Sequence, residues 1–185
     1  MGTFDIHTFV ETYTGPKLRM LFTGVGSYAT GIIGIAGASK VVDSIYVPYS
    51  HEACSNLLRR FYPFGVEVLE SHGSVSSEMV VALHACNSVD LGEALPITVT
   101  GAITTTRYRK GENRAYIAVG RPGEMDVWHL KLDKLSEEEH GDEGAVIRKR
   151  YVQDRIVSEV AICLAVQTQS TLVSELQDGS HLVRL

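Results

Sequence analysis

The chain has 185 residues, of which 44% are hydrophobic and 21% are charged, and its formal net charge at pH 7 is -5. The length suits one domain with a full hydrophobic core. The acidic balance argues against non-specific nucleic-acid binding, which needs a broad basic face. No apolar run approaches the ~20 residues of a membrane span, and no signal-peptide pattern is present, so we expect a cytoplasmic protein with no membrane partner.

The cysteines and histidines do not form a pattern typical of metal proteins. Cys54, Cys86 and Cys163 are too widely spaced for a zinc knuckle or a disulfide framework. His51 would share a helical face with Cys54, and His84 lies close to Cys86, but zinc sites usually need four such ligands. The sequence therefore predicts reduced thiols, no metal site and no cofactor.

The expected elements alternate between helices and strands. Apolar periodicity and turn residues predict helices at residues 4–13, 28–35, 51–60 and 73–86, and a long helix from about residue 146; strands are predicted at 18–22, 41–47, 97–100, 115–119 and 126–132. This order predicts an α/β fold in which the first four strands share one sheet. We expect one domain over residues 1–185, with an N-terminal helix within 1–16 and a polar tail of no clear role at 168–185.

The most distinctive stretch is the loop between the predicted strands at 97–100 and 115–119. It combines Gly101 with three threonines at 104–106 and a basic run at 107–110. Glycine lets the backbone approach a ligand closely, while hydroxyl and guanidinium groups suit a phosphate or a carboxylate. We interpret this loop as a candidate anion site. The alternative is a solvated hairpin whose charges keep the loop soluble.

Two further strand ends point to the same edge of the predicted sheet. Gly24 and Gly26 follow the first strand and precede a helix, a geometry that directs backbone N–H groups at an anion, although the spacing matches neither a dinucleotide fingerprint nor a P-loop. Tyr49 lies at the next strand-to-helix junction, where α/β ligands bind, or else is a core tyrosine. The predicted ligand-binding residues, which should converge on one pocket, are Thr23, Gly24, Tyr49, Thr100, Gly101, Thr104, Thr105 and Arg107.

The first half of the predicted last helix is basic. Arg148, Lys149, Arg150 and Arg155 lie where positive charge opposes the helix dipole. Two explanations fit this pattern: the side chains face an anion, or they pair in solvent with the acidic residues at 137–139.

Five segments resemble, in order, motifs of the CinA C-terminal domain family. They are Gly-Ala-Ser at 37–39, Val-Pro-Tyr-Ser-His-Glu-Ala at 47–53, Ser-His-Gly-Ser-Val-Ser at 71–76, Val-Thr-Gly-Ala at 99–102 and Ala-Tyr-Ile-Ala-Val at 115–119. The resemblance covers roughly residues 18–167. It implies a three-layer α/β/α sandwich around a mixed sheet, usually dimeric. It also implies hydrolysis of the amide of nicotinamide mononucleotide to the nicotinate form and ammonia.

The chain departs from the family at the residues expected to carry the chemistry. The family's Glu-Ser-Cys-Thr-Gly-Gly supplies a serine as the expected nucleophile, and its Tyr-Ser-Asn-Glu-Ala-Lys supplies a lysine that could activate it. Leu21 stands at the serine position and Cys54 at the lysine position. A hydroxyl nucleophile needs an adjacent base near neutral pH, and a leucine with a thiol cannot supply that pair.

Three functions are compatible with this sequence. The first is a divergent family member that binds a mononucleotide or another phosphate-bearing small molecule while its amidohydrolase site is degenerate. The second is an active amidohydrolase with a rebuilt site, for which Ser27, Cys54 and Tyr49 are the catalytic candidates. The third is a non-catalytic structural or interaction protein. From the resemblance we also expect a homodimer or a higher homo-oligomer.

Overall fold

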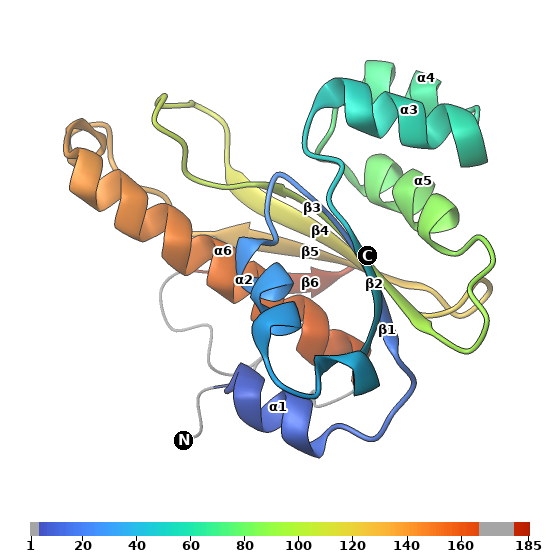
Figure 1. The fold of residues 1–185 in the computed structure, drawn as a ribbon. Helices are drawn as coiled ribbons and strands as arrows, with labels where there is room; N and C mark the ends of the chain where they lie inside the picture. Colours follow the sequence, from blue (N-terminus) through green and yellow to red (C-terminus); the bar gives the residue numbers. More distant parts are fainter. Residues whose placement is uncertain (1–3, 167–179) are drawn as a thin grey trace.

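A mixed six-stranded sheet forms the centre of the computed structural model, which describes residues 4–166 and 180–185 (Figure 1). The strands lie in the order β2 (Val42–Tyr46), β1 (Leu18–Thr23), β3 (Leu95–Ala102), β4 (Asn113–Val119), β5 (Asp126–Leu132) and β6 (His181–Arg184). β1 is parallel to both β2 and β3, and the remaining pairs are antiparallel. The predicted α/β fold and the shared sheet of the first four predicted strands are confirmed.

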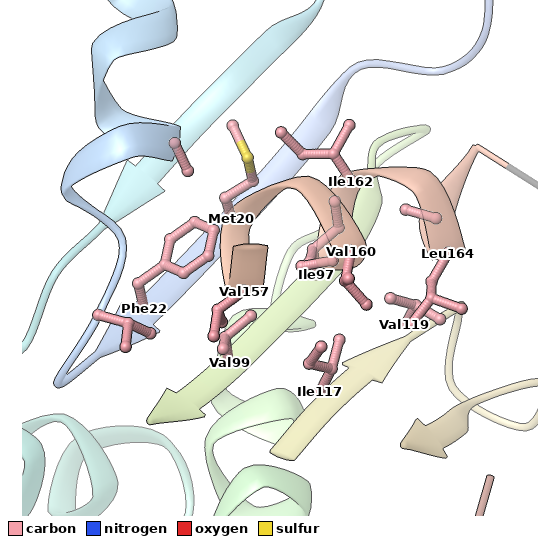
Figure 2. Close-up of a cluster of buried hydrophobic side chains, with 14 of the residues drawn as sticks. Met20, Phe22, Ile97, Val99, Ile117, Val119, Val157, Val160, Ile162 and Leu164 are labelled. Atoms are coloured by element: carbon pink, nitrogen blue, oxygen red, sulfur yellow. The ribbon is translucent and has the colours of Figure 1, made fainter. Parts of the chain in front are cut away.

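One face of the sheet carries the larger hydrophobic core. It is covered by α1 (Ile6–Thr12), α2 (Ser27–Thr30) with the 3-10 turns at Gly31–Gly34 and Ala38–Lys40, and the long helix α6 (Glu143–Ala165). Figure 2 shows Met20 and Phe22 of β1 packed with Val157 of α6 and its neighbours. Alternation along the strand sends these two residues to the same face. Burial of a side chain such as Phe22 stabilises the fold by about 1.5–3 kcal/mol.

The opposite face is covered by α3 (His51–Phe61), α4 (Gly65–His72) and α5 (Ser77–Asn87). Leu21 points to this side and joins a smaller apolar cluster with Leu58 and Met79. Ser50 and Ser76 cap α3 and α5, because their hydroxyls accept hydrogen bonds from backbone nitrogens three residues later at 3.0 and 3.1 Å. The sheet therefore lies between two helical layers.

One α-helix and one strand of the structure are not predicted from the sequence. α4 is short and begins at Gly65, and Phe64 before it supplies no side-chain cap, so the sequence pattern gives no clear start. β6 was placed in a polar tail of no clear role; this is corrected, since His181–Arg184 pairs antiparallel with β5. Residues 168–179 of that tail lie outside the described part of the chain.

Three predicted helices have clearly different bounds in the structure. The helix predicted at 73–86 begins at Ser77, because Ser76 caps it, and ends at Asn87. The helix predicted at 28–35 is a single α-turn that continues as 3-10 helix through Gly31–Gly34. The long helix begins at Glu143, before the predicted start, because Asp142 caps it by accepting a hydrogen bond from the Gly144 nitrogen at 2.8 Å. Among residues 4–166 and 180–185, no helix has both the length and the apolar character needed to cross a membrane.

Candidate functional site

A hollow of about 480 Å³ lies between the glycine turn after β1, the junction of β2 with α3, and the first half of α6. Gly24 and Tyr49 line it, and both were predicted as ligand-binding residues. The catalytic candidate Ser27 also lines it, together with Arg150 and Tyr151 of α6. The hollow thus lies at the ends of β1 and β2, as expected, and is also lined by α6, which the predicted site did not include.

The glycine turn is already occupied by a carboxylate of the protein. Asp154 of α6 is buried, and its oxygens accept hydrogen bonds from the nitrogens of Gly26 at 2.6 Å, Ser27 at 3.3 Å and Tyr28 at 2.7 Å. The Ser27 hydroxyl donates a fourth bond to Asp154 at 2.6 Å. The backbone groups predicted to meet an external anion therefore bind an internal one.

Gly24 and Gly101, predicted to bring the backbone near a ligand, instead pack against the protein itself. Gly24 has a φ of +76°, and a Cβ there would collide with the carbonyl oxygen of Gly101. A Cβ at Gly101 would collide with the side chain of Val25. The absence of side chains at these positions lets the β1 turn and the end of β3 approach each other.

The threonines at the strand ends do not line the hollow. Thr23 and Thr100 are buried in the sheet, with the Thr23 hydroxyl 3.6 Å from the Cys54 sulfur. Thr104, Thr105 and Arg107 lie around a separate gap of only about 10 Å³. The structure therefore brings Gly24 and Tyr49 to one hollow and places the threonine and arginine loop beside another.

The polar groups of that loop are used within the protein. The Thr104 nitrogen donates to Oε1 of Gln153 at 2.8 Å, and the Thr104 hydroxyl accepts from Nδ2 of Asn113 at 2.9 Å. The Thr105 hydroxyl donates to the carbonyl of Arg107 at 2.8 Å. These bonds attach the loop to α6 and give it a defined shape.

One of three neighbouring arginines lines the hollow: Arg150 does, whereas Arg109 lines the separate gap and Arg114 donates to the carbonyl of Val75. Arg150 lines the hollow and donates to the carbonyl of Thr104 at 2.8 Å and to the Tyr49 hydroxyl at 3.2 Å. Burial, and then the nearby charges of Arg114 and Arg150, lower the pKa of Arg109. Within the described ranges, none of the three forms an ion pair with a carboxylate. Uncompensated positive charge in a partly buried position favours an anion.

The other basic residues of α6 are paired. Arg148 pairs with Asp142 at 3.5 Å, Lys149 with Asp133 at 2.6 Å, and Arg155 with Glu159 at 2.7 Å. Ion pairing therefore accounts for these three basic residues, as one of the two explanations predicted. Their partners, however, are not the acidic residues at 137–139. Arg150 differs from these neighbours because it forms no ion pair with a carboxylate of the described residues. The sequence alone does not reveal which residue of a basic run will lack such a partner.

The two positions at which the family motifs have serine and lysine meet in one apolar cluster. Leu21 and Cys54 are each 1% exposed and belong to the cluster between β1 and the α3–α5 layer. The Cys54 thiol donates to the carbonyl of Pro48 at 3.0 Å, and burial raises its pKa. A buried thiol of raised pKa is a poor nucleophile and cannot act as the missing base.

His84 has a structural role. Its Nε2 lies 2.8 Å from the carbonyl oxygen of Gly120 and its Nδ1 lies 3.0 Å from the Thr98 hydroxyl. Because a carbonyl only accepts, the proton is on Nε2, and burial lowers the pKa of the ring. In the ranges 4–166 and 180–185, no three His, Cys, Asp or Glu side chains gather to hold a metal.

The comparison with known proteins identifies the family. A family model described as the CinA C-terminal domain matches residues 22–143. The chain belongs to the CinA C-terminal domain family. No curated protein matches the sequence.

Solved structures of CinA-related proteins share the fold. The competence/damage inducible protein CihA from Agrobacterium tumefaciens is 19% identical, with a TM-score of 0.58, and the match covers 86% of this chain and 99% of that one. A CinA superfamily protein from Klebsiella pneumoniae is 17% identical, with a TM-score of 0.55 and coverage of 85% and 98%. At such identities the likeness shows the common architecture of these CinA-like proteins.

Proposed function

We propose that this CinA-like protein binds a phosphate-bearing small molecule of mononucleotide size in the hollow between the glycine turn and α6, and that it does not hydrolyse the amide of nicotinamide mononucleotide. The hollow's volume of about 480 Å³ lies within the range of small-molecule sites. Tyr49 and Tyr151, which are 66% and 60% exposed, line it and offer aromatic faces to a planar base.

The observation that carries the proposal is Arg150 in the wall of the hollow. Its guanidinium donates to the carbonyl of Thr104 and to the Tyr49 hydroxyl, and it forms no ion pair with a carboxylate among residues 4–166 and 180–185. A protein of net charge -5 has many carboxylates available for pairing. Asp154 also lines the hollow, but its oxygens are occupied by the four hydrogen bonds of the glycine turn, which supports an external anion as the partner of Arg150.

The loss of hydrolysis is supported by the Leu21 and Cys54 cluster, which offers neither a hydroxyl nor a base. The alternative of a rebuilt enzyme has less support. The Ser27 hydroxyl donates to Asp154, but that carboxylate also accepts three backbone hydrogen bonds that hold the turn. Cys54 is buried, and the Tyr49 hydroxyl accepts from Arg150. Binding without hydrolysis is therefore the function we favour.

Thermal unfolding with inorganic phosphate, adenosine monophosphate and nicotinamide mononucleotide tests the proposal. At a free ligand concentration about 100 times the dissociation constant, binding should stabilise the protein by about 2.7 kcal/mol. Arg150→Gln should reduce the shift, whereas Arg148→Gln, an exposed position on the same helix, should not.

Ammonia release from nicotinamide mononucleotide separates the alternatives. We expect none from the purified protein, and robust release would support the rebuilt enzyme. If no ligand raises the melting temperature, the proposal fails and the structural or interaction function is favoured.

A further inference from the structure

A second hollow lies beneath α3, at the β2 edge of the sheet. Its volume is about 700 Å³, and Val47 is the one residue that it shares with the hollow beside α6. Its walls come from β1, β2, the inner face of α3 and the C-terminal end of α5. Small-molecule sites occupy about 300–1,000 Å³, so the size suits a ligand.

The walls are apolar and partly exposed. Tyr46 of β2 is 48% exposed and Phe61 of α3 is 38% exposed, while Leu21 is buried and Leu57 is partly buried. Single exposed apolar residues are ordinary, but several around one concavity indicate a binding surface. Aromatic rings from two different elements favour a planar ring between them.

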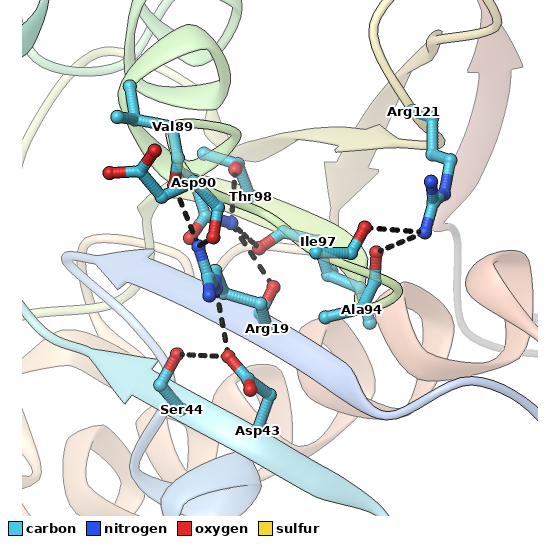
Figure 3. A network of polar contacts seen from close by, with 11 residues as sticks. Arg19, Asp43, Ser44, Val89, Asp90, Ala94, Ile97, Thr98 and Arg121 are labelled. Atoms are coloured by element: carbon cyan, nitrogen blue, oxygen red, sulfur yellow. Dashed lines mark hydrogen bonds and ion pairs between the residues drawn. The ribbon is translucent and has the colours of Figure 1, made fainter.

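The floor is polar and held in one arrangement (Figure 3). Nε of Arg19 donates to Asp43 at 2.9 Å, and its Nη1 donates to the carbonyls of Val89 at 2.8 Å and Asp90 at 3.2 Å. Asp90 has a φ of +50°, which is uncommon for a residue with a side chain. Because Asp43 balances the charge of Arg19, this arginine fixes the floor rather than supplying a free charge.

The floor also contains an acceptor with no donor. Asn87 is buried and uses its Nδ2 on the carbonyls of Arg19 and Ile97 and on the Thr98 hydroxyl, at 3.1, 3.0 and 3.2 Å. Its Oδ1 is buried and has no hydrogen-bond partner in the described residues. Because Oδ1 is closed off from solvent, a ligand in the hollow does not reach it, and Asn87 serves to hold β1, β3 and α5 together beneath the floor.

The free charge of the hollow is at its mouth. The Arg60 guanidinium lies 4.9 Å from the centre of the Phe61 ring. In the ranges 4–166 and 180–185 it forms no ion pair. A carboxylate beside the aromatic wall would supply the missing counter-charge.

We propose that the hollow beneath α3 binds a planar aromatic carboxylate. The ring lies against Tyr46 and Phe61, and the carboxylate lies near Arg60. This site is independent of the proposed phosphate site.

An NMR titration of the full chain with indole-3-acetate tests the site. We expect saturable shifts at α3 and at residues 87–90. Arg60→Gln should raise the dissociation constant by about fivefold, as expected for loss of one partly exposed ion pair. Arg59→Gln is the matched control, because the neighbouring Arg59 contacts Asn56 and does not line the hollow.

Two related probes test the contact with Arg60. Indole-3-acetamide lacks the charge and should bind more weakly than indole-3-acetate, whereas naphthalene-1-acetate keeps the planar ring and the carboxylate and should bind with similar affinity. Binding of the acetamide should not respond to Arg60→Gln. Equal affinity for indole-3-acetate and indole-3-acetamide, equal effects of the two arginine variants, or shifts confined to α2 and α6 would each overturn the proposal.

Discussion

Asp154 and Gly26, 128 residues apart in sequence, are joined by a hydrogen bond of 2.6 Å between the carboxylate and the backbone nitrogen. This bond and its three neighbours fix the turn after β1 to the middle of α6. The helix that carries Arg150 is thereby positioned against the ends of the sheet.

Asp154→Asn should destabilise the fold, because the amide nitrogen cannot accept the hydrogen bonds that one carboxylate oxygen now receives. We expect a loss of about 2–4 kcal/mol in the free energy of unfolding, measured by urea denaturation. Glu137→Gln, at an exposed position, should change it by less than about 0.5 kcal/mol. An equal effect of the two variants would contradict the role given to Asp154.

Gly24→Ala should destabilise the protein through both strain and collision. Gly24 and Gly123 both have a positive φ, but a Cβ meets nothing within 4 Å at Gly123 and meets the Gly101 carbonyl at Gly24. Gly123→Ala should therefore cost about 1–2 kcal/mol from the backbone alone. Gly24→Ala should lower the free energy of unfolding clearly more, as measured by urea denaturation. Equal losses for the two variants would show that Gly24 and the Gly101 carbonyl are not tightly packed.

Mild acid should weaken the fold through His84. Burial holds the pKa of this ring below its ordinary value of 6.5, so the unfolded chain takes up the proton more readily than the folded one. The stabilising contribution is fully present above pH 6.5 and is lost as the pH falls through the folded pKa. The melting temperature should fall more steeply from about pH 7.5 to about pH 5.5 in the natural protein than in His84→Gln. If the melting temperatures of the two proteins fall equally steeply with pH, His84 is not the cause of the loss of stability in mild acid.

Self-association remains a prediction, which rests on the resemblance to the family. Light scattering at micromolar concentration should give at least twice the chain mass of 20.2 kDa. A monomeric natural protein would contradict the prediction.

The hydrophobic pattern of the sequence was sufficient to predict most strands of the sheet, because strands such as β1 and β4 are apolar runs bounded by turns. It could not reveal β6, whose side chains are mostly exposed and whose strand character comes from pairing with β5. In the candidate site, Gly24 and Tyr49 were accessible to sequence reasoning, since they follow strands. The hydrogen bonds that occupy the glycine turn were not, because they depend on Asp154, far away in sequence.

The shared burial of Leu21 and Cys54 couples the two positions. A serine placed at position 21 alone would put an unpartnered hydroxyl in the apolar cluster, and a lysine placed at position 54 alone would bury a lone ammonium group there. Each change made alone should therefore destabilise the fold, so only a double substitution could bring a serine and a lysine together at these positions.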